Sequence, residues 1–558
     1  MLGPTRVISA VAAGIVVLTS CTGDDGERSS DPGKGPPSPV VSRTPIAKVT
    51  QPADGWFESA CELDPDLVER VVRGYYPERS PDVLYVPREP NQFPNNHSGP
   101  WDYLQEVPLL LYGPGYIKTT GNIALEREVT VADLAPTFAE LIGTPWPSDR
   151  AGRVLDEVLV SEQDRETPPR LLLTVVWDGG GTSVLESWPD AWPQLNELSE
   201  KGAYLEGATV GSSPSITPAV HTTIGTGTFP NQHGVVDILY SEGDQMVKSF
   251  NGKSPAAMRI PTLADMYDAE MANEPLVGVL AYKGWHLGMM GQGAYLEGGD
   301  QDIAGIVTQT GTLATNSSYY SLPGGGLQGG LSDDVRRTDA SDGKLDGKWM
   351  GNEVLGSKSE LRDTPVWVYR ETELLQQFIR EERFGKDDVP DLFYINYKQI
   401  DQVGHRWGML EPEMQNMIVH TDSQLEGLVA FLDEWVGRGR WVMALTADHG
   451  PSPDLGATAG WPIHMPVFQS DLWSRFGGEE VFLDERASGL WFRETAADLP
   501  SPESVADFVI DYRIEDDLPE GQELPTRFAD RRLEPVFSAA WPAEALAQVS
   551  RCSGTRPD

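Results

Sequence analysis

The sequence has few basic residues for its length. Its 558 residues contain 43 lysines and arginines against 84 aspartates and glutamates, which gives a formal charge of −41. A charge of this sign repels nucleic-acid backbones and anionic membrane surfaces, so a nucleic-acid polymer is not expected as a partner. An anionic substrate would need a local positive charge, such as a metal ion, to overcome this field.

A short apolar run marks the N-terminus. It extends from Val7 to Leu18 and ends on the sequence LTSC at Cys21. Such a run is too short for an ordinary membrane-spanning helix and is typical of a signal peptide, here residues 1–20. LTSC resembles a bacterial lipobox, which implies a lipid on Cys21 and an exported protein anchored to the outer face of the bacterial cell membrane. An ordinary signal peptide, or an uncleaved anchor with a chance cysteine, is the alternative.

Cysteine is scarce as well. After Cys21, residues up to 55 form a polar tether rich in Pro, Gly and Ser that cannot bury a core, and the remaining residues 56–558 are predicted to form one catalytic domain. Only Cys61 and Cys552 lie in that domain. In an oxidising compartment they could form a disulfide joining the two ends, or they could be two buried free thiols.

Continuous apolar runs of strand length recur along the chain, with helical stretches between them. Continuous rather than alternating hydrophobicity is typical of strands covered on both faces, as in a parallel sheet. The segment from Thr130 to Gly143 has a capping pattern and a terminal glycine that predict a helix. The sequence therefore predicts an α/β sandwich of three layers around a mostly parallel sheet. The strand runs begin at Asp82, Val107, Arg170, Pro275, Asp391 and Arg440.

Carboxylates and imidazoles follow several of these runs. In open α/β sheets, ligands gather beyond the carboxyl ends of the strands. Each Asp or His alone has an ordinary structural explanation, but together they are ligand types that hold zinc. The candidates are Asp178 in VVWDGGG, Thr217 in the motif from Ser215 to Asp237, Asp401 and His405 in QIDQVGHRWG, and Asp448 and His449 in LTADHGP.

These four motifs, in this order, resemble the alkaline phosphatase superfamily, in particular the type I phosphodiesterase/nucleotide pyrophosphatase family. The resemblance covers most of the chain beyond the tether and is diffuse between Ser332 and Pro390. It implies two zinc ions, a nucleophilic Thr217 and a phosphothreonine intermediate. Ser215 and Thr222 are less favoured nucleophiles. The implied ligands are Asp178, Asp448, His449 and Thr217 for one ion, and Asp401, His405 and one further histidine for the other.

The further histidine ligand is expected near the C-terminus in this family. There the chain offers only His464, in different surroundings, whereas NNHSGPWDYLQEVPLLLYGPG places His97 in the expected pattern. We therefore interpret the chain as circularly permuted: residues 56–167 are the family's C-terminal portion, and residues 168–558 are its N-terminal and central portion. Cys61 and Cys552 flank the break. In the usual order, His464 would instead be the ligand.

The substrate is expected to be a small phosphate ester, and its class is less clear from the sequence. Phosphomonoesterase relatives use a Lys-x-Arg pair, whereas this chain has Lys283 followed by Trp285. The missing arginine and a possible stacking role for Trp285 favour a phosphodiester or a nucleotide pyrophosphate. Alternatives are a phosphomonoesterase with Trp285 in the core, a non-catalytic surface-binding lipoprotein, and manganese or iron in place of zinc. A sulfatase is disfavoured because the chain lacks the C/S-x-P-x-R motif that sulfatases need. A phosphoglycerate mutase is disfavoured because the chain has an export signal.

Overall fold

The structure is a computed structural model that describes residues 55–308, 311–324, 330–452 and 454–554. The predicted signal peptide, the predicted lipid site Cys21 and the tether up to residue 54 lie outside the described residues. In the part of the chain that is described, no helix has both the length and the apolar character needed to cross a membrane.

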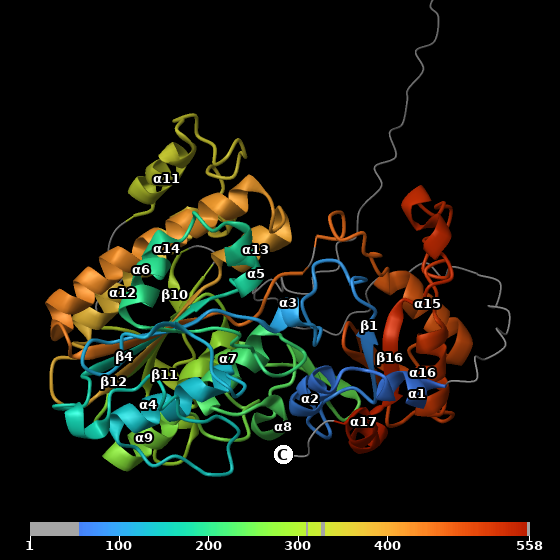
Figure 1. Ribbon diagram of the computed structural model, residues 1–558, viewed down its shortest axis with the longest axis horizontal. Helices are drawn as coiled ribbons and strands as arrows, with labels where there is room; N and C mark the ends of the chain where they lie inside the picture. Colours follow the sequence, from blue (N-terminus) through green and yellow to red (C-terminus); the bar gives the residue numbers. More distant parts are fainter. Residues whose placement is uncertain (1–54, 309–310, 325–329, 453, 555–558) are drawn as a thin grey trace, which may run out of the picture. The chain divides into compact units, whose positions relative to one another are not determined.

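A mixed sheet of ten strands forms the centre of the fold (Figure 1). Strands β8, β12, β4 and β13 run parallel to one another, whereas β2 runs antiparallel to β13. The strands in sheet order are β10 (Leu313–Ala314), β9 (Asp302–Val307), β8 (Val277–Ala281), β12 (Asp391–Tyr397), β4 (Leu171–Trp177), β13 (Trp441–Thr446), β2 (Leu109–Tyr112), β5 (Ala203–Leu205) and β3 (Gly121–Ile123), with β11 (Tyr320–Ser321) beside β9.

Helices cover both faces of this sheet, as Figure 1 shows. Alternate residues of β4 pack into two separate cores, Leu172 and Val176 into one and Leu173 and Val175 into the other. One core includes α4 (Leu134–Ile142), α7 (Thr217–Thr226), α9 (Leu263–Met271) and α10 (Leu287–Met290). The other includes α5 (Thr182–Ser187), α6 (Pro193–Lys201), α12 (Pro365–Glu381), α13 (Gln399–Arg406) and α14 (Pro412–Leu432). The predicted three-layer α/β sandwich is confirmed.

A second, antiparallel sheet is built from segments near both ends of the chain. Its order is β14 (Phe482–Arg486), β15 (Gly489–Phe492), β1 (Val83–Pro87) and β16 (Phe537–Pro542). One face packs with α15 (Met465–Phe476) and α16 (Pro502–Asp511), and the other with α1 (Trp56–Cys61), α2 (Pro65–Gly74) and α17 (Leu546–Ser553). The run from Asp82 is therefore a strand, as predicted, but it belongs to this sheet. Both faces of β1 are buried, which explains why its apolar run looks like those of the main sheet.

The two ends of the described chain are joined by a disulfide between Cys61 and Cys552. These residues lie 491 positions apart in the sequence, in α1 and α17. Of the two possibilities left open by the sequence, the structure has the disulfide.

The segment from Thr130 to Gly143 is helical, as predicted. It begins with a short 3-10 turn, Val131–Asp133, in which Thr130 and Asp133 form a reciprocal capping box, and continues as α4. Gly143 ends it with a φ of 78°, a left-handed conformation that glycine adopts without strain. The remaining short elements are α3 (Asp102–Gln105), α8 (Pro230–His233), α11 (Ser332–Asp339) and the hairpin of β6 (Leu239–Glu242) and β7 (Gln245–Lys248).

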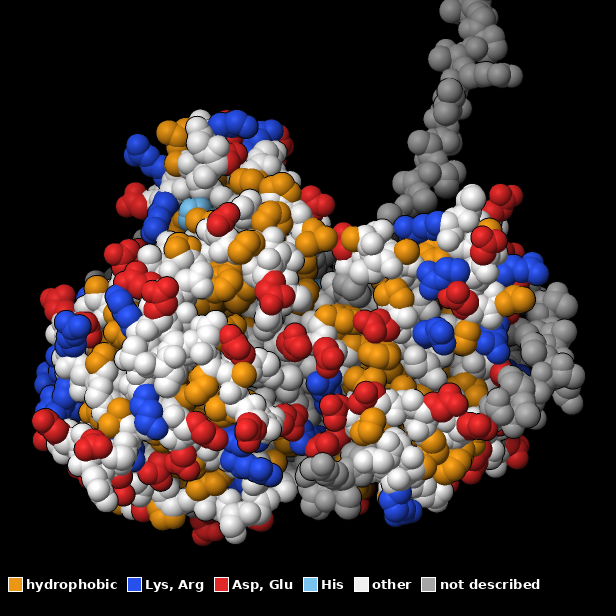
Figure 2. All heavy atoms as spheres, viewed as in Figure 1, with side chains coloured by type: hydrophobic (Ala, Val, Ile, Leu, Met, Phe, Trp, Pro, Cys, Tyr) orange, Lys and Arg blue, Asp and Glu red, His pale blue; other side chains and the backbone are white. Residues whose placement is uncertain are grey.

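On the face seen in Figure 2, charged side chains are spread over the surface. Figure 2 shows acidic side chains scattered across the face in view, with basic and hydrophobic side chains between them. On this face the negative charge is therefore not gathered into one large patch. A distribution of this kind gives a diffuse negative field, against which a local cationic centre would stand out.

Candidate metal centre

Three adjacent parallel strands bring the predicted acidic residues to one edge of the main sheet. Strand β4 lies between β12 and β13. Asp178 follows β4 directly, Asp448 follows β13 after one residue, and Asp401 lies in the first turn of α13, just after β12. Because the carboxyl ends of parallel strands meet at one edge, the three carboxylates come together. Each of these residues is buried, with at most 1% of its surface exposed.

The predicted ligands form two groups of three. In each group, one donor atom from each residue can be chosen so that all three atoms lie within 4.8 Å of one another. The groups are His97 with Asp401 and His405, and Asp178 with Asp448 and His449. Asp401 and His405 share the helix α13, so their i and i+4 spacing places them on one face.

His97 reaches this site from the segment between β1 and α3. Its Nδ1 lies 2.8 Å from the backbone oxygen of Ser215, and the Ser215 hydroxyl donates a hydrogen bond of 2.6 Å to the backbone oxygen of His97. Its ring stacks on His449, with ring centroids 3.5 Å apart. The segment before Thr217 thus fixes the position of His97 on two sides.

His464 lies elsewhere. It stands just before α15, and its Nδ1 is 2.9 Å from the backbone oxygen of Asp517. Its backbone N–H donates to the Asp517 carboxylate at 2.8 Å. Neither donor group includes His464. The structure therefore brings His97, and not His464, beside Asp401.

Thr217 is the first residue of α7, and 1% of it is exposed. Its Oγ1 accepts a hydrogen bond of 3.3 Å from the ammonium of Lys398. The two alternative nucleophiles are engaged in backbone contacts, because Ser215 donates to His97 and the Thr222 hydroxyl donates to the Pro218 oxygen at 2.7 Å. Of these three hydroxyls, the structure places that of Thr217 against the charged groups of the site.

Several residues of the site were not anticipated from the sequence, and Lys398 is the foremost. Its ammonium lies 2.6 Å from Asp178 Oδ1 and 2.8 Å from Asp401 Oδ2, and the side chain is fully buried. Asn396, from β12, donates to Asp178 Oδ2 at 3.0 Å. The one available signal was position, since Lys398 directly follows the apolar run of β12 and precedes Asp401 by three residues.

Two buried histidines form a third group with Asp178. His221 and His286 are fully buried and provide donor atoms within 4.8 Å of the aspartate. His221 Nδ1 lies 2.8 Å from the backbone oxygen of Thr217, one turn earlier in α7. Burial lowers the pKa of His286 to about 3, so this ring is neutral. His221 lies within the motif from Ser215 to Asp237, but the sequence analysis did not assign it to the site.

Neighbouring charges keep the carboxylates ionised. Burial alone would raise the pKa of Asp178, but the Lys398 ammonium, His286 and His449 hold it well below its ordinary value. Burial likewise opposes ionisation of Asp401, and here His405 and Lys398 lower the pKa. The site therefore presents fixed negative charge to a cation.

The donor set fits metal ions. His449 Nε2 and Asp448 Oδ2 are buried, and neither has a hydrogen-bond partner among the described residues. Their ion-pair contacts are long, 3.5 Å from His449 Nε2 to Asp178 Oδ1 and 3.6 Å from Asp448 Oδ2 to His221 Nδ1, so a further group that pairs with these atoms would lower the cost of burying them. Two clusters of carboxylate and imidazole donors, with a hydroxyl beside them, match the ligand chemistry of zinc.

Trp285 packs in a core of the protein, and Lys283 lies beside it. Trp285 is 3% exposed and belongs to the core on the α7 side of the main sheet. The Lys283 ammonium lies 4.5 Å from the centroid of its ring. Lys283 itself is buried just after the end of β8. The predicted stacking of Trp285 on a substrate has no support from this position, and the alternative of a core residue describes it.

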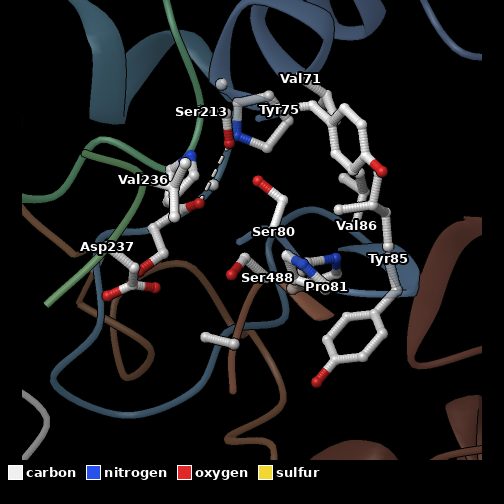
Figure 3. Close-up of a pocket in the computed structure, with 18 of the residues that line it drawn as sticks. Val71, Tyr75, Ser80, Pro81, Tyr85, Val86, Ser213, Val236, Asp237 and Ser488 are labelled. Carbon is white, nitrogen blue, oxygen red and sulfur yellow. Dashed lines mark hydrogen bonds between the residues drawn. The ribbon is translucent and has the colours of Figure 1, made fainter. Parts of the chain in front are cut away.

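A pocket adjoins the site without containing its ligands (Figure 3). Its wall includes Ser98, next to His97, and Ser213 and Pro214, just before the Thr217 segment. Figure 3 shows Tyr75 and Tyr85 on one side of the pocket and Asp237 on the other. The pocket therefore lies between β1 of the second sheet and the loops that position His97 and Thr217.

Comparison with known families gives one extended match. Residues 172–454 match the model of the family described as type I phosphodiesterase / nucleotide pyrophosphatase. This range begins in β4 and ends after the Asp448–His449 pair, so it includes every predicted ligand except His97.

Three curated relatives match over shorter segments. Alkaline phosphatase PafA of Elizabethkingia meningoseptica is 25% identical over 123 residues, 22% of each chain. Alkaline phosphatase PhoV of Synechococcus elongatus is 31% identical over 78 residues, 14% of each chain. A calcium-transporting ATPase of Myroides odoratus is 23% identical over 113 residues, 20% of this chain and 19% of the relative. The matched segments thus span about a fifth or less of these relatives.

Among solved structures, wild-type PafA aligns with a TM-score of 0.47 at 15% identity. The alignment covers 67% of this chain and 84% of PafA. A mutant of PafA with several substitutions aligns equally.

Proposed function

The chain belongs to the type I phosphodiesterase/nucleotide pyrophosphatase family, and from this premise we propose that it is a metal-dependent hydrolase of phosphate esters. The observation that carries the proposal is the meeting of two three-residue donor groups beside the hydroxyl of Thr217. A nucleophile held next to metal ligands is the arrangement that phosphoryl transfer requires.

Two zinc ions are the proposed cofactors. The first would be held by Asp178, Asp448 and His449 together with Thr217, and the second by Asp401, His405 and His97. When bound, such ions lower the pKa of a nearby hydroxyl, hold a phosphoryl oxygen and stabilise a departing alkoxide. Manganese or iron could bind the same donors, and metal analysis of the purified protein distinguishes them.

Thr217 is the proposed nucleophile. Its oxygen attacks phosphorus, the new O–P bond forms, and the bond to the ester oxygen breaks, which gives a phosphothreonine. Water then cleaves the phosphothreonine and restores the hydroxyl. Because Thr217 is the first residue of α7, the N-terminus of that helix adds a favourable field for an anionic phosphoryl group.

Two ester classes remain candidates for the substrate. The absence of an arginine after Lys283 favours a phosphodiester or a nucleotide pyrophosphate, which carries less charge per phosphorus. The core position of Trp285 removes the other argument for that class. Lys398 is a further cation next to the nucleophile, and its charge favours the doubly charged monoester. The relatives PafA and PhoV, both described as alkaline phosphatases, favour the same class.

The ratio of kcat/KM for an aryl phosphate diester to that for the matching monoester distinguishes these classes. The zinc-loaded wild-type protein is the enzyme to use. A strong diester preference supports a phosphodiesterase, and a monoester preference supports a phosphatase. Absence of turnover with both, in protein that carries zinc, would contradict the proposed function and favour a non-catalytic surface protein.

Replacement of Thr217 tests the mechanism. We expect Thr217→Ala to lower kcat by at least ~1,000-fold, since removal of a nucleophile has effects of this size or larger in enzymes that form a covalent intermediate. Thr217→Ser retains the hydroxyl and is expected to retain measurable turnover. The matched control is Thr120→Ala, an exposed threonine outside the site. Mass spectrometry of acid-quenched enzyme should locate a phosphoryl group on residue 217, and its appearance on Ser215 or Thr222 would contradict the assignment.

A circular permutation is the proposed origin of this chain order. Three observations support it: His97 joins Asp401 and His405, the segment before β4 supplies β2 to the same sheet, and a disulfide links Cys61 to Cys552 near the two ends. Permutation is tolerated when the original termini are close together. A chain rebuilt in the family order should fold with the same metal content, and failure to do so would argue against it.

Export and lipid attachment at Cys21 are also proposed. The Cys61–Cys552 disulfide supports an oxidising compartment. Cys21→Ala should release the protein from membranes into the soluble fraction, and an unchanged membrane fraction would exclude anchoring through this residue.

A further inference from the structure

The ammonium of Lys398 lies among the carboxylates of the metal centre. It is 2.6 Å from Asp178 Oδ1 and 2.8 Å from Asp401 Oδ2, so it contacts one aspartate from each donor group. The residue is fully buried. A buried ammonium is costly unless it is paired, and these two carboxylates provide the pairing.

A third contact distinguishes this lysine from a simple ion-pair partner. Its Nζ donates to Thr217 Oγ1 at 3.3 Å. The geometry around the contact is fixed, because Asn396 holds the other oxygen of Asp178 at 3.0 Å and Asp178 can therefore turn only one oxygen to the lysine. Lys398 directly follows β12, so the main sheet sets its position.

The contact is selective for the proposed nucleophile. The Ser215 and Thr222 hydroxyls donate to backbone oxygens, which leaves Thr217 as the hydroxyl that meets the ammonium. Asp178 and Asp401 accept from two of the three N–H groups of the ammonium, and Thr217 Oγ1 accepts from the third. The placement therefore has a chemical consequence for that oxygen.

We infer that Lys398 is a catalytic residue that orients Thr217 Oγ1 and compensates the negative charge developing on it during attack. This inference rests on the proposed function and adds a residue to the same site. As Thr217 Oγ1 bonds to phosphorus, the ester P–O bond breaks, the hydroxyl proton passes to water, and the leaving alkoxide takes a proton from water. The ammonium takes no part in the proton transfer and contributes positive charge beside Thr217 Oγ1, in addition to that of the metal ions.

The test is Lys398→Met in zinc-loaded protein, because methionine has a similar length and no charge. We expect kcat for an aryl phosphate ester to fall at least ~100-fold, as when one charge-stabilising donor is removed from an active site. We expect KM to change less than kcat. Lys398→Arg retains the charge but cannot place it equally well, so it should recover part of the lost kcat. Lys348→Met is the control, since it removes a partly exposed lysine that pairs with Glu353 outside the site.

Zinc affinity provides a readout independent of turnover. Loss of a positive charge next to both donor groups should strengthen zinc binding by at least ~10-fold in calorimetric titration of chelator-stripped protein. A lysine that only holds the ligands in place would give the opposite result, a weaker zinc affinity together with a lower melting temperature. Weakened or unchanged zinc affinity, or unchanged kcat, overturns the inference.

The two proposals fail separately. If the wild-type protein with zinc bound hydrolyses no phosphate ester, the proposed function fails, whereas tighter zinc binding by Lys398→Met would still place the ammonium within the metal field. If the wild-type protein is active and Lys398→Met is equally active, only the role of Lys398 fails. If Lys398→Met does not fold, the comparison of Lys398→Arg with the wild type decides. Full kcat and unchanged zinc affinity in the arginine variant would mean that the exact position of the charge is unimportant. That result would overturn the inference.

Discussion

Two groups of buried carboxylates in the protein differ in their ionisation. Asp178 and Asp401, at the metal centre, have pKa values held well below the ordinary range by Lys398 and by histidines, although burial opposes this. Burial, the Asp300 carboxylate and nearby aspartates raise the pKa of Asp268 to about 7. Burial alone therefore does not set the charge of a carboxylate, because the partner that faces it decides the outcome.

The second group consists of Asp268 on α9, Asp302 at the start of β9 and the exposed Asp300. Their donor atoms lie within 4.8 Å of one another, as closely as those of the metal centre. Among the described residues, no lysine, arginine or histidine forms an ion pair with them. Burial and the neighbouring aspartates, Asp268 first, raise the pKa of Asp302 well above its ordinary value. We refer to these three residues as the acidic cluster.

Removal of a histidine should break the metal centre and leave the acidic cluster untouched. We expect His97→Ala to weaken zinc binding by at least ~100-fold, since loss of even an outer partner of a metal ligand typically costs about 10- to 100-fold. His464→Ala is the matched control, because His464 pairs with Asp517 away from both donor groups. Zinc titration of chelator-stripped proteins measures both variants. Loss of affinity in His464→Ala with full affinity in His97→Ala would reverse the ligand assignment and remove the main support for the permutation.

Zinc removal should lower the free energy of unfolding through the metal centre and not through the acidic cluster. Because a ligand that binds only the folded state stabilises it by mass action, zinc at about 100 times its Kd should add about 2.7 kcal/mol per site to the free energy of unfolding. We expect the same gain in Asp302→Asn, whose substitution lies in the acidic cluster. Thermal unfolding with zinc and with EDTA measures the gain. A smaller gain in Asp302→Asn would mean that zinc also binds at the acidic cluster.

Much of this organisation was predictable from the sequence. The apolar runs predicted the strands β4, β8, β12 and β13, and the rule that ligands gather at the carboxyl ends of strands led to Asp178, Asp401 and Asp448. The i and i+4 spacing of Asp401 and His405 predicted a shared face, which α13 provides. These features follow from local periodicity and from the chemistry of single side chains.

Other features depend on contacts that local patterns do not encode. The run at β1 looks like a strand of the main sheet because both of its faces are buried, yet it pairs with β15 and β16. Trp285 could equally stack on a ligand or fill a core, and only the packing around β8 decides. Lys398 was overlooked because ammonium groups do not bind metals, and its burial appears only when β4 and β12 place Asp178 beside it.

The acidic cluster predicts a small dependence of stability on pH. The folded-state pKa of Asp268 is raised to about 7, chiefly by burial and then by Asp300. A raised pKa means that the folded protein binds this proton more tightly than the unfolded chain, in which an aspartate titrates near about 4. The stability contributed by the neutral form is therefore complete below about pH 4 and is lost as the pH rises through about 7.

Asp268→Asn removes this ionisation while keeping a neutral side chain of the same shape. Its melting temperature should exceed that of the wild type by roughly 2 °C at about pH 8, and the difference should shrink towards about pH 5. Asp530→Asn, which changes an exposed aspartate, controls for the loss of one charge from an acidic protein. Asp268→Asn could instead be less stable than the wild type at the higher pH. The Asp268 carboxylate of the wild type would then be ionised and paired with a cation in the folded protein. In that case both groups of carboxylates would have a cationic partner, and they would differ only in which cation it is.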